Sequence, residues 1–167
     1  MMIKVNYTYF VIFLILSSCG IYTFSGSSIP KDAQTITIKS LKNIALNKQP
    51  TLSQVMTEKL KDFFVQRTNL TFVEEDGDLF FSGNITKYEI KPMAINSNQT
   101  AGQNRLKIEV KIVFKNKFQA SNNFEQNFIR YQDFSSETNL IDIEDDLVEE
   151  ISKQLVEDIF NKSVVNW

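Results

Sequence analysis

Residues 106 to 114 read Leu-Lys-Ile-Glu-Val-Lys-Ile-Val-Phe, and every even-numbered position in this run is apolar. Successive side chains of a β-strand point to opposite faces, so this alternation predicts a strand with one buried face. It is the most regular alternation in the chain. The fold is therefore expected to form around this strand, with other apolar surfaces covering its even-numbered side chains.

Two apolar stripes with helical spacing lie on either side of this strand in the chain, and each predicts an amphipathic helix. Thr51 fits an N-cap for the first helix, with Gln54 completing a capping box. The second helix is expected from about Asp142 to Asn161. The first stripe consists of Leu52, Val55, Met56, Leu60, Phe63 and Phe64, and the second of Ile143, Leu147, Ile151, Leu155 and Ile159.

Further strands are expected at residues 36–38, 70–72, 79–90 and 124–134. Within residues 79–90 the apolar side chains change from odd to even positions close to Gly83, which indicates a bulge or bend. The order β-α-β-β-β-β-α predicts an α+β fold. We expect a two-layer sandwich in which both helices pack on a mostly antiparallel sheet of four to five strands. The expected core comprises Leu60, Phe63, Ile108, Val110, Ile112, Leu147, Ile151 and Leu155.

The N-terminus has the features of an export signal. Lys4 precedes an apolar run over residues 9–16, which is shorter than the roughly 20 helical residues that span a bilayer. Leu16-Ser17-Ser18-Cys19 then resembles the bacterial lipobox, in which a peptidase cuts before a cysteine that carries acyl chains such as palmitate. The alternative is an ordinary secretory peptide with an incidental cysteine. We expect residues 1–18 to be a cleaved signal, 19–31 a lipidated flexible tether, and 32–167 one domain.

Composition excludes several kinds of chemistry. The 167 residues contain no His, so Ser-His catalysis, Cys-His catalysis and imidazole metal sites are excluded. The one Cys cannot form an intramolecular disulfide. The chain up to Ile141 is mildly basic, whereas the segment from Asp142 carries eight acids and two lysines. Neither balance indicates nucleic-acid binding. No enzyme activity, cofactor or metal is expected.

Four stretches together resemble a known family, and the similarity covers essentially the whole chain after the signal. They are residues 19–26, residues 51–54, residues 104–106 and, most specifically, residues 156–167, which read Val-Glu-Asp-Ile-Phe-Asn-Lys-Ser-Val-Val-Asn-Trp. The family is the lipopolysaccharide-assembly lipoprotein LptE in its Bacteroidota form. Its fold, two helices against a four-stranded sheet, agrees with the fold that the residue patterns predict.

Gly20 rather than Asp follows Cys19, which favours the outer membrane, and no acidic cluster follows the cysteine, so the domain is expected to face the periplasm. The resemblance implies that the lipoprotein is non-catalytic. In this family the lipoprotein sits inside the β-barrel LptD, assists assembly of the barrel, plugs it, and helps deliver lipopolysaccharide to the outer leaflet. The expected partners are therefore LptD, lipopolysaccharide and the membrane that holds the anchor. The alternative is a periplasm-facing ligand-binding or scaffold lipoprotein with no barrel partner.

The odd-numbered face of the central strand is the candidate binding site. Side chains two residues apart on this face lie about 7 Å apart, so the cations form a row, interrupted by Glu109 and Val113. These cations are expected to repel one another, and an anionic lipid phosphate or an acidic partner would stabilise them. The alternatives are a solvated sheet face, or an edge strand that lysines protect from aggregation. Trp167, past the last helix, either contacts a partner or folds back on the core. The candidate row consists of Arg105, Lys107, Lys111, Lys115 and Lys117.

The acidic run at the start of the last helix could suggest a Ca²⁺ site. Its spacing does not match a Ca²⁺-binding EF-hand loop, and no Gly provides the turn. A solvated helix face, meeting a basic partner, is the preferred interpretation. Asp76-Gly77-Asp78 is expected to be only a turn.

Overall fold

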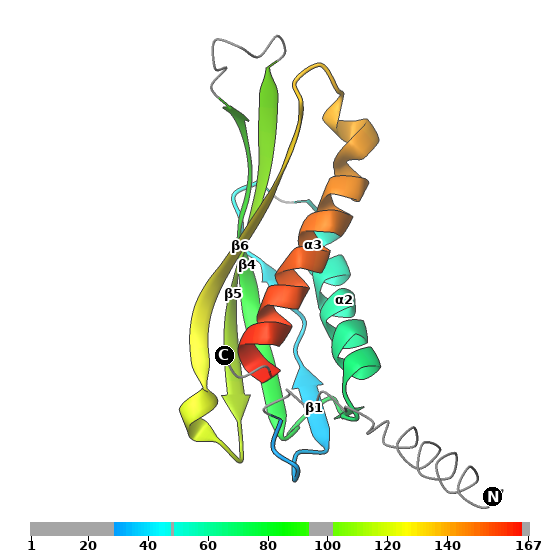
Figure 1. Cartoon of the computed structure of the whole chain (residues 1–167). Coiled ribbons are helices and arrows are strands. Elements are labelled where there is room, and N and C mark those ends of the chain that lie inside the picture. The colour runs from blue at the N-terminus through cyan, green and yellow to red at the C-terminus, as the bar shows by residue number, and fades with distance from the viewer. Residues whose placement is uncertain (1–28, 48, 94–101, 165–167) are drawn as a thin grey trace, which may run out of the picture.

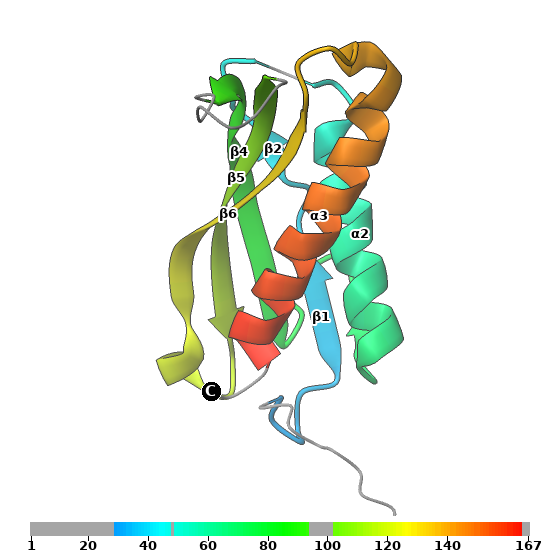
Figure 2. The same ribbon diagram turned by 45° about the horizontal axis from the view of Figure 1, so that its top comes forward.

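A computed structural model describes residues 29–47, 49–93 and 102–164. Two helices lie side by side along one face of a long, twisted sheet (Figure 1). Both helices run in the same direction, and a 45° turn shows them again on the same side of the strands (Figure 2). In chain order the elements are β1 (Thr35–Ile38), β2 (Lys42–Asn43), α2 (Leu52–Arg67), β3 (Thr71–Phe72), β4 (Leu79–Met93), β5 (Gln103–Asn116), the 3-10 turn η1 (Ala120–Asn122), β6 (Phe124–Ser135) and α3 (Leu140–Val164).

The central strand forms as its alternation predicts. The even-numbered apolar residues of β5, from Leu106 to Phe114, are almost fully buried and face the helices. Most of the expected core is confirmed, because Leu60, Ile151 and Leu155 are also completely buried. The remaining two expected core residues, Phe63 and Leu147, are only partly buried and pack against the core from its margin.

The sheet has more strands than expected, and its strand order decides between two interpretations of β5. The order is β3-β1-β4-β5-β6, with β2 also paired to β4. The strands β1, β2 and β3 are short and pair in parallel, whereas β4, β5 and β6 form a long antiparallel meander. Since β5 has a partner on each side, it is an interior strand, and the prediction of a lysine-protected edge is wrong.

The predicted bulge lies in β4. Ile85 pairs with Val110 and Lys87 pairs with Glu109, which leaves Thr86 as the extra residue. This insertion moves the core-facing positions from odd to even numbers. Gly83, just before the bulge, lies opposite Ile112, and a Cβ at this position would come within 2.2 Å of the Lys111 carbonyl oxygen. Only Gly allows β4 and β5 to approach so closely here.

The cap of α2 differs from the predicted capping box. Thr51 is the N-cap residue, but its side chain does not bond to the backbone of the helix. Instead, the side-chain oxygen of Gln49 accepts a hydrogen bond of 2.6 Å from the Leu52 N–H. Gln54 reaches forward to Glu58 rather than back to the cap. Gln49 therefore satisfies one free N–H of the first turn, that of Leu52, whereas the Thr51 side chain does not make the bond to the Gln54 N–H that a capping box requires.

The predictions that concern the membrane anchor and the C-terminal tail fall on residues that the structure does not describe. Cys19 and Trp167 lie outside the described residues. No helix in the described ranges is long and apolar enough to cross a membrane. The basic row, in contrast, lies wholly within the described structure.

Candidate functional site

The face of the sheet opposite the helices carries the basic row. Along β5 the odd-numbered residues alternate with the buried even-numbered ones, so Arg105, Lys107, Lys111 and Lys115 share this open face. Lys117 lies just beyond the end of the strand at Asn116. The geometry of the row is therefore as expected from the sequence, with the helices covering only the other face (Figure 2).

Arg105, at one end of the row, is held by the neighbouring strand β6. Its guanidinium donates hydrogen bonds of 2.7 and 2.8 Å to both carboxylate oxygens of Asp133. These hydrogen bonds lower the pKa of the Asp133 carboxyl. The guanidinium also lies 3.6 Å from the centre of the Tyr131 ring. A planar guanidinium can make both contacts at once, so this cation is fully engaged within the chain.

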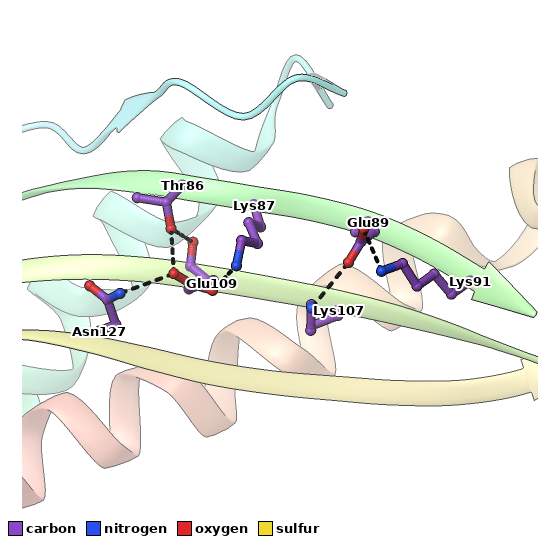
Figure 3. Close-up of polar contacts among 7 residues, drawn as sticks. All are labelled: Thr86, Lys87, Glu89, Lys91, Lys107, Glu109 and Asn127. Carbon is purple, nitrogen blue, oxygen red and sulfur yellow. Dashed lines mark hydrogen bonds and ion pairs between the residues drawn. The ribbon is translucent and has the colours of Figure 1, made fainter. Parts of the chain in front are cut away.

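Lys107 is paired from the other side, by β4. Its ammonium lies 3.0 Å from Glu89, and Lys91 lies 2.9 Å from the same carboxylate (Figure 3). The hydrogen bonds from Lys91 and Lys107 lower the pKa of Glu89. One acid thus serves two cations on the solvent-exposed part of the sheet.

Glu109, the acid that interrupts the row, is the most buried charged side chain on this face, with 7% of its side chain exposed. Lys87 lies 2.9 Å from one of its oxygens, while Asn127 and the bulge residue Thr86 donate hydrogen bonds of 3.1 and 3.2 Å to the other (Figure 3). The hydrogen bond to Glu109 raises the pKa of Lys87. Glu109 therefore ties β4, β5 and β6 together at the bulge.

Three of the five cations in the row have an acidic partner, since Lys111 also pairs with Glu125 of β6. The expectation that unpaired cations in the row repel one another is therefore wrong for Arg105, Lys107 and Lys111. The acids come from β4 and β6, and they meet the cations only through the register of the sheet. The sequence does contain a sign of such an acidic partner in residues 87–91, where Lys87, Glu89 and Lys91 alternate with apolar residues and so share one face of a strand.

The other end of the row is different. Lys115 and Lys117 line a hollow of about 430 Å³ together with Lys39, Phe80 and the acidic residues Glu75 and Asp76. Lys117 donates a hydrogen bond of 2.6 Å to the Asp76 backbone oxygen, and Lys39 makes an exposed contact of 3.4 Å with Glu75. Within the described ranges, Lys115 has no acidic group within ion-pair distance. This end therefore combines the unpaired ammonium group of Lys115 and the apolar side chain of Phe80 with two lysines that already have partners.

The acidic start of α3 does not form a metal site in the described part of the chain, where no three acidic side chains gather. One member has a structural role, because Glu144 accepts a hydrogen bond from the Tyr88 hydroxyl. Burial is the main cause that raises the pKa of Tyr88, and this hydrogen bond raises it further. Asp76-Gly77-Asp78 is a turn between β3 and β4, as expected, and Asp78 accepts hydrogen bonds from the start of β1.

Solved structures share this fold at low sequence identity. A minor lipoprotein from Acinetobacter baumannii matches with a TM-score of 0.51 and 8% identity, over 78% of this chain and 91% of that one. A homologue of a neuraminyllactose-binding hemagglutinin from Helicobacter pylori matches with a TM-score of 0.51 and 12% identity, over 84% and 88%. The rare lipoprotein B from Shewanella oneidensis has a TM-score of 0.47 and 15% identity, over 77% and 92%. At these identities the first two matches show a common fold alone.

No curated protein sequence matches the chain. The family described as LptE, lipopolysaccharide-assembly, matches residues 33–163, which is most of the chain and includes every described strand and helix apart from Val164, the last residue of α3. The chain therefore belongs to the LptE family, a generally non-catalytic lipoprotein family associated with the outer membrane, and this membership implies a role in lipopolysaccharide assembly.

Proposed function

We propose that this protein is a Bacteroidota-type LptE that is lipidated on Cys19 and acts with the outer-membrane β-barrel LptD. In this proposal it assists assembly of the barrel, plugs its lumen and helps transfer lipopolysaccharide to the outer leaflet. The family match over residues 33–163 is the observation that carries the proposal. The lipobox-like sequence before Cys19 supports the anchor, and Trp167 is proposed as a partner contact.

The basic row is proposed as the surface that meets lipopolysaccharide or the barrel. Its two ends have different tasks in this proposal. Arg105, Lys107 and Lys111 already have acidic partners, so any ligand there must compete with an existing ion pair. Lys115 and Lys117 line a hollow whose wall includes Phe80, together with Glu75, which already pairs with Lys39. A phosphate group with attached acyl chains suits this combination of ammonium groups and apolar surface.

Binding of purified lipopolysaccharide to the full-length protein tests the proposed site. Exchanging Lys115 and Lys117 for Gln is expected to weaken binding about tenfold at low salt, because two charge-assisted contacts are lost. The matched control exchanges Lys153 and Lys162 of α3 for Gln, which removes the same charge from a distant surface. Wild-type affinity is also expected to fall as salt rises.

Two outcomes would count against this site. Equal losses in both double variants would mean that only net charge matters. Unchanged affinity in the Lys115 and Lys117 variant would make the row a solvated sheet face. Co-purification of LptD with the lipoprotein tests the barrel partnership separately.

A further inference from the structure

A hollow of about 400 Å³ lies at the end of the domain where the chain enters β1. Its lining includes Pro30 and Lys31, which precede β1, and Gln66, Arg67 and Asn69 around the end of α2. Both views show the start of β1 and the end of α2 at the same end of the molecule, and the start of α3 at the opposite end (Figures 1 and 2). The hollow therefore lies at the end from which residues 20–28 lead back to Cys19.

The two cations of this hollow have no acidic partner. Within the described ranges, no carboxylate lies within ion-pair distance of Lys31 or Arg67. The Arg67 guanidinium instead lies over the ring of Phe63, 4.4 Å from its centre. An aromatic ring positions a cation without neutralising its charge. Two cations, with the amide donors of Gln66 and Asn69 in the same lining, suit a phosphate group.

The end of α2 is the negative end of the helix dipole, and a cation in the last turn also stabilises the helix. Part of this negative end is already satisfied, because the Thr68 N–H and hydroxyl both donate to the Phe64 carbonyl oxygen, at 2.9 and 2.7 Å. The dipole gives a structural reason for Arg67. It gives none for Lys31, which comes from a separate segment and lines the same hollow.

The tether cannot neutralise these cations. Residues 20–28 read Gly-Ile-Tyr-Thr-Phe-Ser-Gly-Ser-Ser and contain no acid. The tether does limit how far the hollow can lie from the proposed anchor, since the ten residues between Cys19 and Ile29 span at most about 35 Å. A tether of this length keeps the phosphates of the membrane at a high effective concentration beside the hollow. The start of α3 is farther away, because a helix of 25 residues is about 38 Å long.

We propose that this hollow binds the phosphate of an anionic glycerophospholipid in the leaflet that holds the anchor, with Lys31 and Arg67 contacting it. This proposal rests on the proposed lipidation of Cys19. It is compatible with the proposed position inside a barrel, because the tether has to leave the barrel at its rim to reach the membrane. The end of the domain that carries the hollow then lies next to the headgroups.

Fluorescence quenching in vesicles tests the contact. The full-length acylated protein is placed in vesicles of phosphatidylcholine and phosphatidylglycerol that include a phospholipid with a nitroxide on its headgroup. A fluorophore is attached at Thr71→Cys, an exposed position next to the hollow, or at Ile141→Cys, at the opposite end. Changing both Lys31 and Arg67 to Gln should lower the ratio of docked to undocked protein about 25-fold, at about fivefold for each cation near an anionic surface. Quenching at residue 71 should therefore fall towards that at residue 141, and raised salt should have the same effect on the wild type.

Two matched variants separate the position of the charge from its amount and from the structure of the helix. Lys31→Arg with Arg67→Lys keeps both charges and should keep the wild-type quenching. Lys42→Gln with Lys153→Gln removes the same charge from exposed positions outside the hollow and should also leave quenching unchanged. Equal losses in the two Gln double variants would mean that only net charge matters and would overturn the proposal.

Flotation of the same vesicles, with unlabelled protein, separates the hollow from the anchor. Protein that stays on the vesicles at high salt, with equal quenching in the wild type and in the Lys31 and Arg67 variant, would refute the hollow and leave the anchor standing. Protein that leaves the vesicles at high salt would refute the anchor. In that case, flotation at low salt that depends on Lys31 and Arg67 would still support the hollow, and its absence would refute the hollow as well.

Discussion

Replacing Ile112 with Ala tests which face of β5 is the core. Ile112 is completely buried and lies opposite Gly83, which has no side chain that could fill the space. The change removes three carbons, and at about 0.8 kcal/mol for each the transfer loss is about 2.4 kcal/mol. The cavity adds to this loss, so the free energy of unfolding should fall by about 3–5 kcal/mol.

Urea unfolding followed by circular dichroism measures this loss, provided that the slope with denaturant stays the same. Val113→Ala is the matched control, because Val113 is the next residue along β5 and lies on the open, partly exposed face. It should cost about 1 kcal/mol or less. A loss below about 1 kcal/mol for Ile112→Ala, or a larger loss for Val113→Ala, would refute the assignment of the buried face.

Four further perturbations test other parts of the account. Gly83→Ala should lower the free energy of unfolding by about 1–3 kcal/mol, because its Cβ would clash with the Lys111 carbonyl; an unchanged value would contradict the close approach of β4 and β5. Ser152→Ala should raise it by about 1 kcal/mol, since the buried hydroxyl has no hydrogen-bond partner among the described residues; a clear loss would reveal a partner. Backbone and side-chain hydrogen bonds from the start of β1 lower the pKa of Asp78, so its stabilisation is present above its unfolded pKa and is lost as the pH falls through the folded pKa. The stability difference between wild type and Asp78→Asn should therefore shrink in acid, and a constant difference from neutral pH to about pH 2 would contradict this. Cys19→Ala should yield unanchored or unprocessed protein, whereas a variant that still partitions into membranes with the mature wild-type mass would exclude lipidation.

The sequence predicts the fold well wherever one face of an element is uniformly apolar. The alternation in β5 identifies both the strand and its buried face, and the stripe from Ile143 to Ile159 identifies α3 with its ends shifted by two or three residues. The bulge in β4 is also visible, because inserting Thr86 leaves a change of parity in the apolar pattern. Each of these features is a property of one continuous segment.

Features that depend on the pairing of two segments are harder to predict from the sequence. The pairing of Lys107 with Glu89 requires the register between β4 and β5, so the row on β5 suggests repulsion when considered alone. The interior position of β5 likewise depends on where β6 pairs. Thr51 is the N-cap as predicted, but the side-chain bonds of the capping box are not formed, because Gln49 reaches the Leu52 N–H from outside the motif and Gln54 bonds to Glu58. The hollow beside Lys115 includes Lys39 and Phe80, which come from different parts of the chain.

Co-purification from native membranes tests the central claim most directly. Full-length tagged protein would be isolated from detergent-solubilised outer membranes and its partners identified by mass spectrometry, with an abundant unrelated outer-membrane protein followed as the control for carry-over. The account predicts that an LptD-type β-barrel is strongly enriched, while the unrelated protein is not. Isolation of the lipoprotein without any enriched β-barrel would contradict the account and favour a scaffold or ligand-binding lipoprotein instead.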